Sequence, residues 1–501
     1  MPTGAVLMIQ GTASSAGKSF LVAGLCRLLV QEGYRVAPFK AQNMSNNAAV
    51  TGDGHEIGRA QAVQAQAARL LPHVDMNPVL LKPEADNRSQ VIVMGRPFAT
   101  LDAAAYQEAK LRVWDEVTAA LDRLRSAYDV LLVEGAGSPA EINLKARDIS
   151  NMRVALHAQA PVLLVGDIDR GGVFAHLYGT YHLLEPAEQA LVRGFVINKL
   201  RGDPSLLEPG LVEIERLTSV PVLGVVPWVN DPQLPEEDSV ALDRRRDAAG
   251  PFTGIDVAVV RFKRIANFDD FDGLEAERDV RVRYVHHPGD LGDPDLVVLP
   301  GTKAIRADLA WMRAQGLDRA IAAVRERGTF VVGVCGGYQV LGERIDDPLG
   351  FEGEPGSAEG LGWLPVQTRF GEGKVTRQSA MTVVSARGIL ERASGVRVDG
   401  YEIHAGETQV HPAAVAAMLG DGTPVGAIDA SGRVFGCYLH GLFAADQFRQ
   451  AVLRHVANRR GKRYEPTIQL SADAAFDRLA DVLRSSLNLP AIFELIESQR
   501  R

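Results

Sequence analysis

The feature that most constrains the fold is an alternation of short apolar runs with longer segments of helical spacing, which begins at the first residues. Glycine, proline, asparagine and aspartate lie close to these runs, as they do around buried strands. In the first half of the chain the predicted strands are Val6–Ile9, Val36–Phe39, Val130–Val133, Val162–Val165, Phe195–Ile197 and Val222–Val226. Strands that alternate with helices are typical of a parallel sheet covered on both faces. The alternation therefore predicts an α/β fold with a doubly wound sheet.

A second alternation begins at Ile255 and includes the runs IDVAVVR, VRVRYV, DLVVLPG, TFVVGVCGG and GRVFGCYLHG. The residues just before it are polar, charge-dense and contain proline, as in a linker. A chain of 501 residues is also too long for one core. We therefore predict a first domain over residues 1–228, a linker over 229–253, a second α/β domain over 254–450 and a helical extension over 451–501.

Composition narrows the class of protein. Apolar residues make up 46% and charged residues 23% of the chain, close to the average for a globular protein. The net charge of −8 argues against nucleic-acid binding, which needs a basic face. The three cysteines are too few for a disulfide framework, and the apolar N-terminal run is too short to span a bilayer. We expect a cytoplasmic enzyme without nucleic-acid or membrane partners; its oligomeric state stays open.

A glycine-rich segment between the first predicted strand and a helix indicates a nucleotide site. Gly11 and Gly17 bound a turn whose backbone N–H groups face phosphate, although they lie one residue farther apart than in the common P-loop pattern. Lys18 would reach the terminal phosphates, and the Ser19 hydroxyl would bind Mg²⁺. With Thr12, these residues form the predicted ATP site.

Polar residues also follow other strands of this domain, where parallel sheets bind their ligands. Glu134 could hold Mg²⁺ directly or through water, and Asn198 could read the adenine edge. Asp167 and Asp169 could serve the metal or the phosphorylation of a substrate carboxylate. Alternatively, Asp169 could simply pair with Arg170.

A cysteine flanked by glycines indicates a nucleophile in the second domain. Cys335 follows an apolar strand and precedes a helix start, which is the context of a nucleophile elbow. The N–H group of Gly336 would face a developing oxyanion, and Gly301, at the end of another strand, would supply a second donor. His440 ends a late strand and is the predicted base. His404 is a secondary candidate for substrate contact.

These motifs resemble known families. GVCGGYQ with a downstream LHG is similar to class I glutamine amidotransferases, and GTASSAGKS with VEGAG is similar to dethiobiotin-synthetase-like ATPases. FKAQNMSNNA, GRAQAVQAQAA, NPVLLKP and VGDIDRGGVFA resemble the cobyric acid synthases. The resemblance extends from the first strand to about residue 450. It implies an N-terminal P-loop NTPase-like domain and a C-terminal, flavodoxin-like amidotransferase domain.

The resemblance also implies a reaction. Four carboxylates (b, d, e and g) of adenosylcobyrinic acid a,c-diamide would be amidated, with ATP and Mg²⁺ forming acyl phosphates and glutamine supplying ammonia. The corrinoid is then a substrate rather than a cofactor. Lys40, Gln42, Asn43 and Ser45 follow the second predicted strand, beside the glycine-rich turn, and would bind the substrate's carboxylates or amides.

Two alternatives remain open. One is an amidase of another polycarboxylate, such as the a,c positions of cobyrinate or a cell-wall lipid intermediate. The other is a non-catalytic, ParA-like ATPase switch, which gains support because Leu442 stands where most class I amidotransferases have a glutamate two residues after the histidine. An intact Cys335 and His440 favour an enzyme. The third member of the cysteine–histidine pair stays unassigned.

Overall fold

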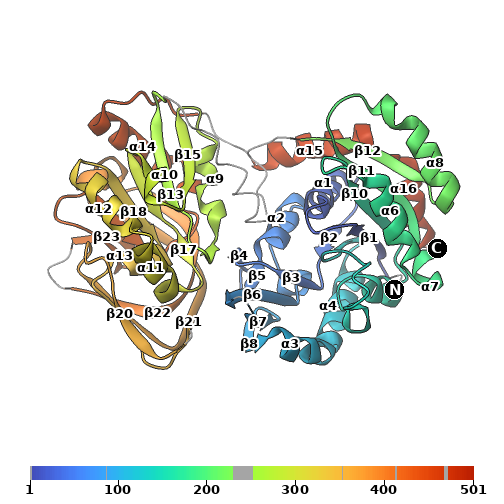
Figure 1. Cartoon of the computed structure of the whole chain (residues 1–501), viewed down its shortest axis with the longest axis horizontal. Helices are drawn as coiled ribbons and strands as arrows, with labels where there is room; N and C mark the ends of the chain where they lie inside the picture. The colour runs from blue at the N-terminus through green and yellow to red at the C-terminus, as the bar shows by residue number, and fades with distance from the viewer. Residues whose placement is uncertain are drawn as a thin grey trace.

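The computed structural model describes residues 3–85, 87–229, 252–352, 354–411, 415–467 and 472–500. It forms two lobes that lie side by side (Figure 1). The predicted linker, apart from its ends, lies outside the described residues. No helix in the described ranges combines the length and the apolar character needed to cross a membrane.

The first lobe is built on a six-stranded parallel sheet of order β12-β11-β10-β1-β9-β2. Its strands are β1 (Ala5–Gly11), β2 (Val36–Phe39), β9 (Val130–Glu134), β10 (Val162–Asp167), β11 (Val192–Leu200) and β12 (Val222–Pro227). Alternate residues of β1 enter different cores: Val6 and Met8 pack on one face, and Leu7 and Ile9 on the other. These strands are the six that the sequence predicts, and both faces are buried as expected.

Helices cover both faces of this sheet. One core receives side chains from α4 (Trp114–Ala127), α5 (Met152–Ala158), α6 (Val173–His182) and α8 (Glu208–Thr218). The opposite core receives them mainly from α1 (Lys18–Gln31), with α2 (Arg59–Ala67) contributing to both.

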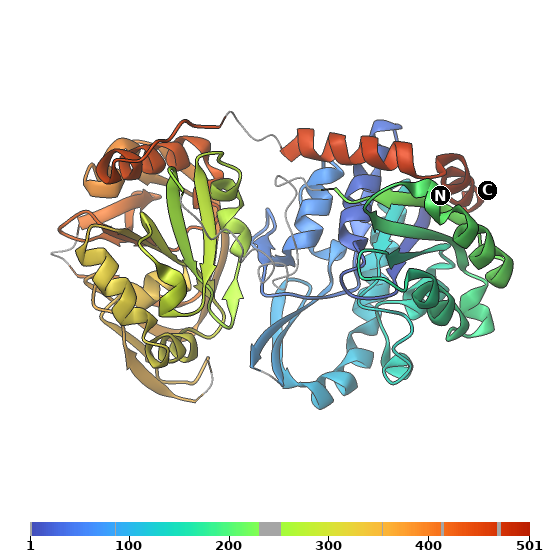
Figure 2. The same ribbon diagram turned by 45° about the horizontal axis from the view of Figure 1, so that its top comes forward.

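The last two helices of the chain return to this first lobe. They are α15 (Ala472–Ser486) and α16 (Leu489–Ser498), drawn in red along the first lobe in Figure 2. Phe476, Leu479 and Leu483 of α15 enter the core on the α1 side of the sheet. The packing is close, because a Cβ at Gly24 of α1 would lie 2.5 Å from Leu483.

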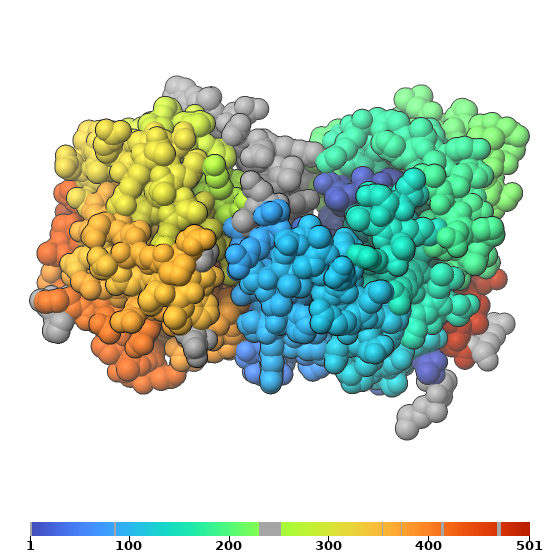
Figure 3. Space-filling model, turned by 60° about the horizontal axis from the view of Figure 1, so that its bottom comes forward, coloured from blue at the N-terminus to red at the C-terminus, as the bar shows by residue number. Residues whose placement is uncertain are grey.

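An excursion between β2 and β9 forms the side of the first lobe that faces the second. It contains a four-stranded sheet, a two-stranded sheet and the short helix α3 (Ala103–Ala109). The strands are β3 (Gln42–Met44), β6 (Val79–Ala85), β7 (Arg88–Val93) and β8 (Arg96–Asp102), with β4 (Ala48–Val50) paired to β5 (Glu56–Gly58). Ion pairs from Glu56 to Lys374 and from Glu84 to Lys303 cross to the second lobe. Figure 3 shows this light-blue segment against the yellow and orange lobe.

The second lobe contains an 11-stranded mixed sheet. Its parallel part has the order β15 (Val280–Val285), β13 (Ile255–Val260), β16 (Leu296–Leu299), β18 (Phe330–Val334) and β25 (Val434–Cys437). The strand pattern did not predict the continuation of this sheet, in which every pairing is antiparallel except that of β19 with β21. It contains β24 (Thr423–Ile428), β23 (Val415–Gly420), β21 (Val366–Val383), β22 (Arg397–Val410), β19 (Arg344–Asp347) and β20 (Gly356–Glu359). The main helices of this lobe are α11 (Ile305–Ala314), α12 (Leu317–Glu326), α13 (Gly336–Leu341) and α14 (Asp446–Arg460).

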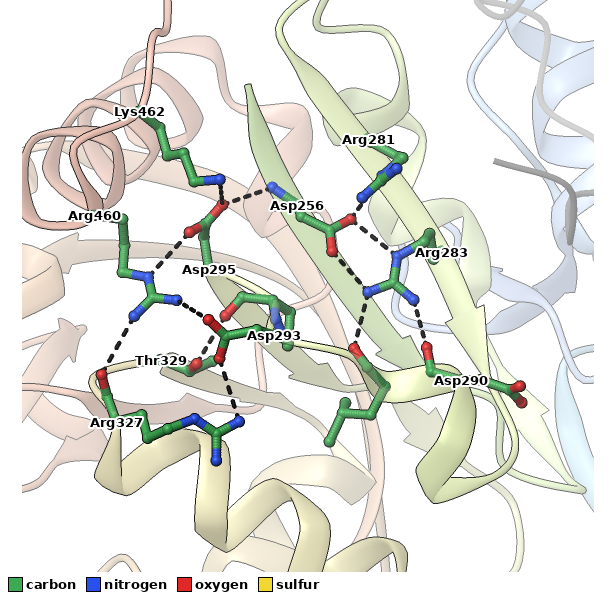
Figure 4. A network of polar contacts seen from close by, with 12 residues as sticks. Asp256, Arg281, Arg283, Asp290, Asp293, Asp295, Arg327, Thr329, Arg460 and Lys462 are labelled. Atoms are coloured by element: carbon green, nitrogen blue, oxygen red, sulfur yellow. Dashed lines mark hydrogen bonds and ion pairs between the residues drawn. The ribbon is translucent and has the colours of Figure 1, made fainter. Parts of the chain in front are cut away.

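A polar network ties together the amino ends of the parallel strands in the second lobe (Figure 4). Asp256 pairs with Arg281 at 2.9 Å and with Arg283 at 2.7 Å. Asp295 accepts from Arg460 at 3.0 Å, which attaches the end of α14 to the sheet. Because the predicted nucleophile follows the carboxyl end of β18, this network stabilises the edge opposite the candidate site.

Candidate functional site

Cys335 lies on a strained turn between β18 and α13. Its backbone has φ 52° and ψ −111°, and its side chain is largely buried. A left-handed φ is rare for residues other than glycine and is often found at functional sites. The turn also requires glycine at 337, because a Cβ there would lie 1.9 Å from the Leu299 carbonyl oxygen. The glycine-flanked cysteine therefore forms the elbow that the sequence predicts.

His440 follows β25 and lies beside this cysteine, held by a carboxylate. Its Nδ1 is 2.7 Å from Oδ2 of Asp270, whose Oδ1 accepts from the Gly441 N–H at 2.8 Å. Asp270 belongs to the short 3₁₀ helix Phe268–Phe271. A Cβ at Gly301 would lie 3.5 Å from His440 Cε1 and 3.8 Å from Cys335 Cβ, so the predicted oxyanion residue is adjacent to both. The structure thus brings together a Cys–His–Asp constellation.

The charge of this constellation follows from its buried partners. Burial lowers the pKa of His440, but the Asp270 carboxylate and a hydrogen-bonding interaction with Cys335 oppose this and raise it to about 10. Cys437 lacks such a partner, and burial raises the pKa of its thiol to about 12. Burial likewise raises the pKa of the Cys26 thiol well above its usual range. In the part of the chain that the structure describes, Cys335 is the cysteine with an imidazole partner, as a nucleophile requires.

Asp270 is the functional residue that sequence reasoning missed. The expected position for an orienting acid, Leu442, is buried in the apolar core and cannot serve. Asp270 lies 170 residues before His440, within FDDFDG, and no spacing rule connects the two. The only local signal is an acidic segment near the end of a predicted strand.

A cavity of about 190 Å³ opens beside Cys335 and His440. Gln339, from the cysteine motif, lines it with a buried Oε1 that has no hydrogen-bond partner among the described residues. His404 also lines it, stacked on Tyr438 with ring centroids 3.6 Å apart. Residues of the first lobe complete the wall, namely Lys82, Gln90 and Pro97. The cavity therefore reaches the boundary between the lobes.

The glycine-rich turn of the first lobe has the geometry of a phosphate loop. Gly17 has φ 96°, and the 14-residue helix α1 begins at Lys18. The Lys18 ammonium is held by backbone carbonyl oxygens of its own loop, at 2.9 Å from Ala13 and 3.1 Å from Ser14. The Thr12 hydroxyl is buried without a partner among the described residues. These donors around one turn fit a polyphosphate.

Glu134 is the centre of a buried polar cluster next to this turn. It accepts from the Ser19 hydroxyl at 2.8 Å, from Lys40 at 2.7 Å and from Gln64 at 2.5 Å. Within the described residues no group of three or more histidine, cysteine or acidic side chains gathers as a metal site. The neighbouring oxygens of Ser19 and Glu134 nevertheless fit Mg²⁺, which usually takes one or two protein ligands and fills its other positions with water and phosphate.

Two other predicted residues, Asn198 and Asp167, support the glycine-rich turn through hydrogen bonds and an ion pair. The Asn198 amide donates to the Ala16 carbonyl oxygen at 2.9 Å. Asp167 pairs at 2.8 Å with Lys199, which also donates to the Ser15 carbonyl oxygen at 2.5 Å. These contacts fix the backbone of the glycine-rich turn. The adenine role of Asn198 and the substrate or metal role of Asp167 stay predictions.

The rest of the predicted substrate residues do not converge on Glu134. Asp169 pairs with Arg201 at 2.8 Å, whereas Arg170 lies 3.7 Å from Asp167. Gln42 accepts from the Tyr106 hydroxyl at 2.7 Å. The Asn43 amide donates to Gln61 at 2.9 Å, and the Ser45 hydroxyl accepts from the Asn47 N–H at 3.0 Å. Lys40 of this loop contacts Glu134 and so lies on the nucleotide side.

Comparisons with known proteins agree with this division into two lobes. Residues 7–240 match the family model described as "CobQ/CobB/MinD/ParA nucleotide binding domain", and residues 256–448 match "CobB/CobQ-like glutamine amidotransferase domain". The chain is 50% identical over 496 residues to a cobyric acid synthase of Chloroflexus aurantiacus, covering 98% of each chain. It is 49% identical over 492 residues to that of Roseiflexus castenholzii, covering 97% of each, and 49% identical over 521 residues to that of Sorangium cellulosum, covering 100% of each. The chain therefore belongs to the cobyric acid synthase family.

Proposed function

We propose that the chain amidates the b, d, e and g carboxylates of adenosylcobyrinic acid a,c-diamide, using ATP and glutamine, to give adenosylcobyric acid. The observation that carries this proposal is the cavity that begins at Cys335 and His440 and ends on first-lobe residues. Such a cavity allows a product of the cysteine site to pass toward the nucleotide-binding lobe. The names of the full-length relatives support the choice of substrate.

In the second lobe, the Cys335 sulfur attacks the side-chain carbonyl carbon of glutamine. N–H groups at Gly301 and Gly336 stabilise the oxyanion, and His440 gives a proton to the leaving nitrogen. Ammonia departs, and water activated by His440 hydrolyses the thioester to glutamate. Asp270 holds the imidazole in the tautomer and orientation that these proton transfers need.

The cavity also offers partners for the other end of glutamine, because a carboxyl group and two lysines line it. Glu352 lines it, and burial raises the pKa of this carboxyl to about 8. Lys303 and Lys374 line the same space. A zwitterionic amino acid presents one ammonium and one carboxylate. The lysines can pair with the carboxylate, and the bound ammonium would draw the Glu352 carboxyl into its ionised form.

In the first lobe, a substrate carboxylate oxygen attacks the γ-phosphorus of ATP, and the bond to ADP breaks. The Lys18 ammonium stabilises the negative charge on the transferring phosphoryl group, and the N–H groups around Gly17 bind the phosphates. Mg²⁺ held by Ser19 and Glu134 would neutralise charge on the phosphate oxygens. Ammonia then attacks the acyl carbon, and phosphate leaves as the amide forms.

Ammonia must reach that carbon without being protonated, since ammonium is not a nucleophile. Lys82 and Pro97 of the first lobe close one side of the cavity beside Cys335. A passage sheltered by both lobes is therefore part of the proposal.

The test is incubation with MgATP, glutamine and the a,c-diamide, followed by mass spectrometry of the corrinoid. We expect stepwise addition of four amides. Product should vanish in Lys18→Ala with any nitrogen source, and in Cys335→Ala when glutamine is the only source. An unchanged corrinoid with active glutamine hydrolysis would reject the substrate and favour another polycarboxylate. A protein without glutamine hydrolysis would favour a nucleotide switch.

A further inference from the structure

An ion pair crosses the boundary between the lobes next to the Cys–His–Asp constellation. Arg59, the first residue of α2 in the first lobe, lies 2.8 Å from the carboxylate of Asp269 in the second lobe. Asp269 is almost completely buried and immediately precedes Asp270, which orients His440. The charge of Asp269 thus has its partner on the other lobe.

A second first-lobe residue, Ala48, forms a hydrogen bond with the loop that carries Asp269 and Asp270. The Ala48 N–H donates to Asn267 Oδ1 at 3.0 Å, and Asn267 Nδ2 donates to the Tyr401 hydroxyl at 3.2 Å. Tyr401 stacks on the His440 ring, with centroids 5.2 Å apart. The Tyr401 and His440 backbones also exchange both of their hydrogen bonds, at 3.3 and 2.9 Å. The loop that carries Asp270 is therefore held at two points by first-lobe residues.

We propose that Arg59 is a positioning residue for glutamine hydrolysis, which holds Asp270 against His440 through the neighbouring Asp269. The reason is electrostatic. Two adjacent buried carboxylates repel each other, and removing one partner of a buried ion pair leaves an uncompensated charge that is strongly destabilising. Burial raises the pKa of Asp269, and Arg59 opposes that rise. Without Arg59, the loop must move Asp269 toward water or protonate it, and either change disturbs Asp270.

The inference rests on the proposed cysteine chemistry but not on the corrinoid, because glutamate release is measured with glutamine alone. In the full-length protein, Arg59→Gln should lower kcat for glutamine hydrolysis by about 10- to 100-fold, the range expected for a displacement of about 1 Å. KM for glutamine should stay within about threefold, since Arg59 does not line the cavity. Thermal unfolding and circular dichroism establish that the variant is folded.

A rescue separates positioning from a general loss of structure. Asp269→Asn removes the carboxylate that needs a partner, so the double variant Arg59→Gln, Asp269→Asn should recover kcat to within a few-fold of wild type. Arg59→Lys keeps the charge and should retain more activity than Arg59→Gln. If Arg59→Gln does not fold, Arg59→Lys and the double variant decide: both should keep kcat within a few-fold of wild type, and loss of activity in a folded double variant would overturn the proposal.

The matched control is Arg123→Gln, which also takes an arginine partner from a buried carboxylate. Arg123 Nε donates to Asp75 Oδ2 at 3.1 Å, and both residues belong to the first lobe. We expect kcat of this variant for glutamine hydrolysis to remain within about twofold of wild type. Equal losses in Arg123→Gln and Arg59→Gln, wild-type kcat in Arg59→Gln, or failure of the double variant to recover would each overturn the proposal.

Discussion

The two candidate sites differ in how ready their groups are for chemistry. Beside Cys335, the histidine and the aspartate already contact each other in the order that proton transfer requires. In the first lobe, Lys18 is held by its own loop and Glu134 is surrounded by three donors. A nucleophile that belongs to the chain can be positioned in advance, whereas a phosphate site must exchange internal partners for ligand oxygens. Substitutions at the two sites should therefore affect different steps.

The largest effect is expected from removing the nucleophile. Cys335→Ala should lower glutamine hydrolysis by about 10³-fold or more, because the covalent route is lost. Amidation supported by ammonium should persist, since the first lobe is untouched. Glutamate release and corrinoid amidation are measured in parallel. Loss of both activities together would contradict the independence of the two sites.

Removing the orienting charge should have the next largest effect. Asp270→Asn keeps the size of the side chain but favours the wrong imidazole tautomer, and kcat for glutamine hydrolysis should fall by about 10²- to 10⁴-fold. Steady-state kinetics measure the loss. The control is Asp272→Asn, two residues after Asp270 in the same acidic segment. Its kcat for glutamine hydrolysis should remain within a few-fold of wild type.

The first lobe should give the opposite pattern. Lys18→Ala should reduce amidation by about 10²-fold or more with either nitrogen source, because the cation that stabilises charge on the phosphoryl group is lost. Glutamine hydrolysis without ATP should stay close to wild type. A parallel fall in glutamine hydrolysis would show that the two sites are not separable in this way.

A stability measurement can extend the comparison to the lobes themselves. Leu483→Ala in α15 removes a fully buried side chain packed on Gly24 and should lower the free energy of unfolding of the first lobe by about 2–5 kcal/mol. Denaturant unfolding followed by probes in each lobe should report the change in the first lobe. Val482→Ala, a less buried neighbour on the same helix, should cost less.

The last prediction concerns the dependence of the second lobe's stability on pH. The pKa of His440 is about 10 in the folded protein, against an ordinary value of 6.5. Its contribution to stability is therefore full below pH 6.5 and is lost as the pH rises through 10. Unfolding of the second lobe, measured by denaturant at several pH values, should become easier over this interval. The dependence should be shallower in Asp270→Asn, which lacks the charge that raises the pKa.

Sequence signals that are local predicted their parts of the structure well. The apolar runs identified the parallel strands because a buried strand must be apolar along its length. The glycines around Cys335 and Lys18 predicted two tight turns because those backbones leave little room for side chains. Family membership and the α/β class followed from the same motifs and are confirmed by the comparisons.

Features that form between segments far apart in the sequence could not be predicted in the same way. Asp270 becomes an orienting residue only when its loop meets His440, 170 residues later. The strands β21 and β22 are largely polar and pair with each other over most of their length, so apolar runs do not reveal them. The sequence predicted a helical extension over 451–501, but not that Phe476, Leu479 and Leu483 would pack on the first lobe.

The return of α15 to the first lobe has a consequence for biosynthesis. Domains generally fold in order as the chain leaves the ribosome. Here the α1 side of the first sheet is completed by residues that are translated only after the whole second lobe. The first lobe to be made is thus the last to be finished, and during translation its Leu483-binding surface on α1 remains uncovered. A nascent chain halted before residue 472 should expose this surface to chaperones, while its second lobe is already complete.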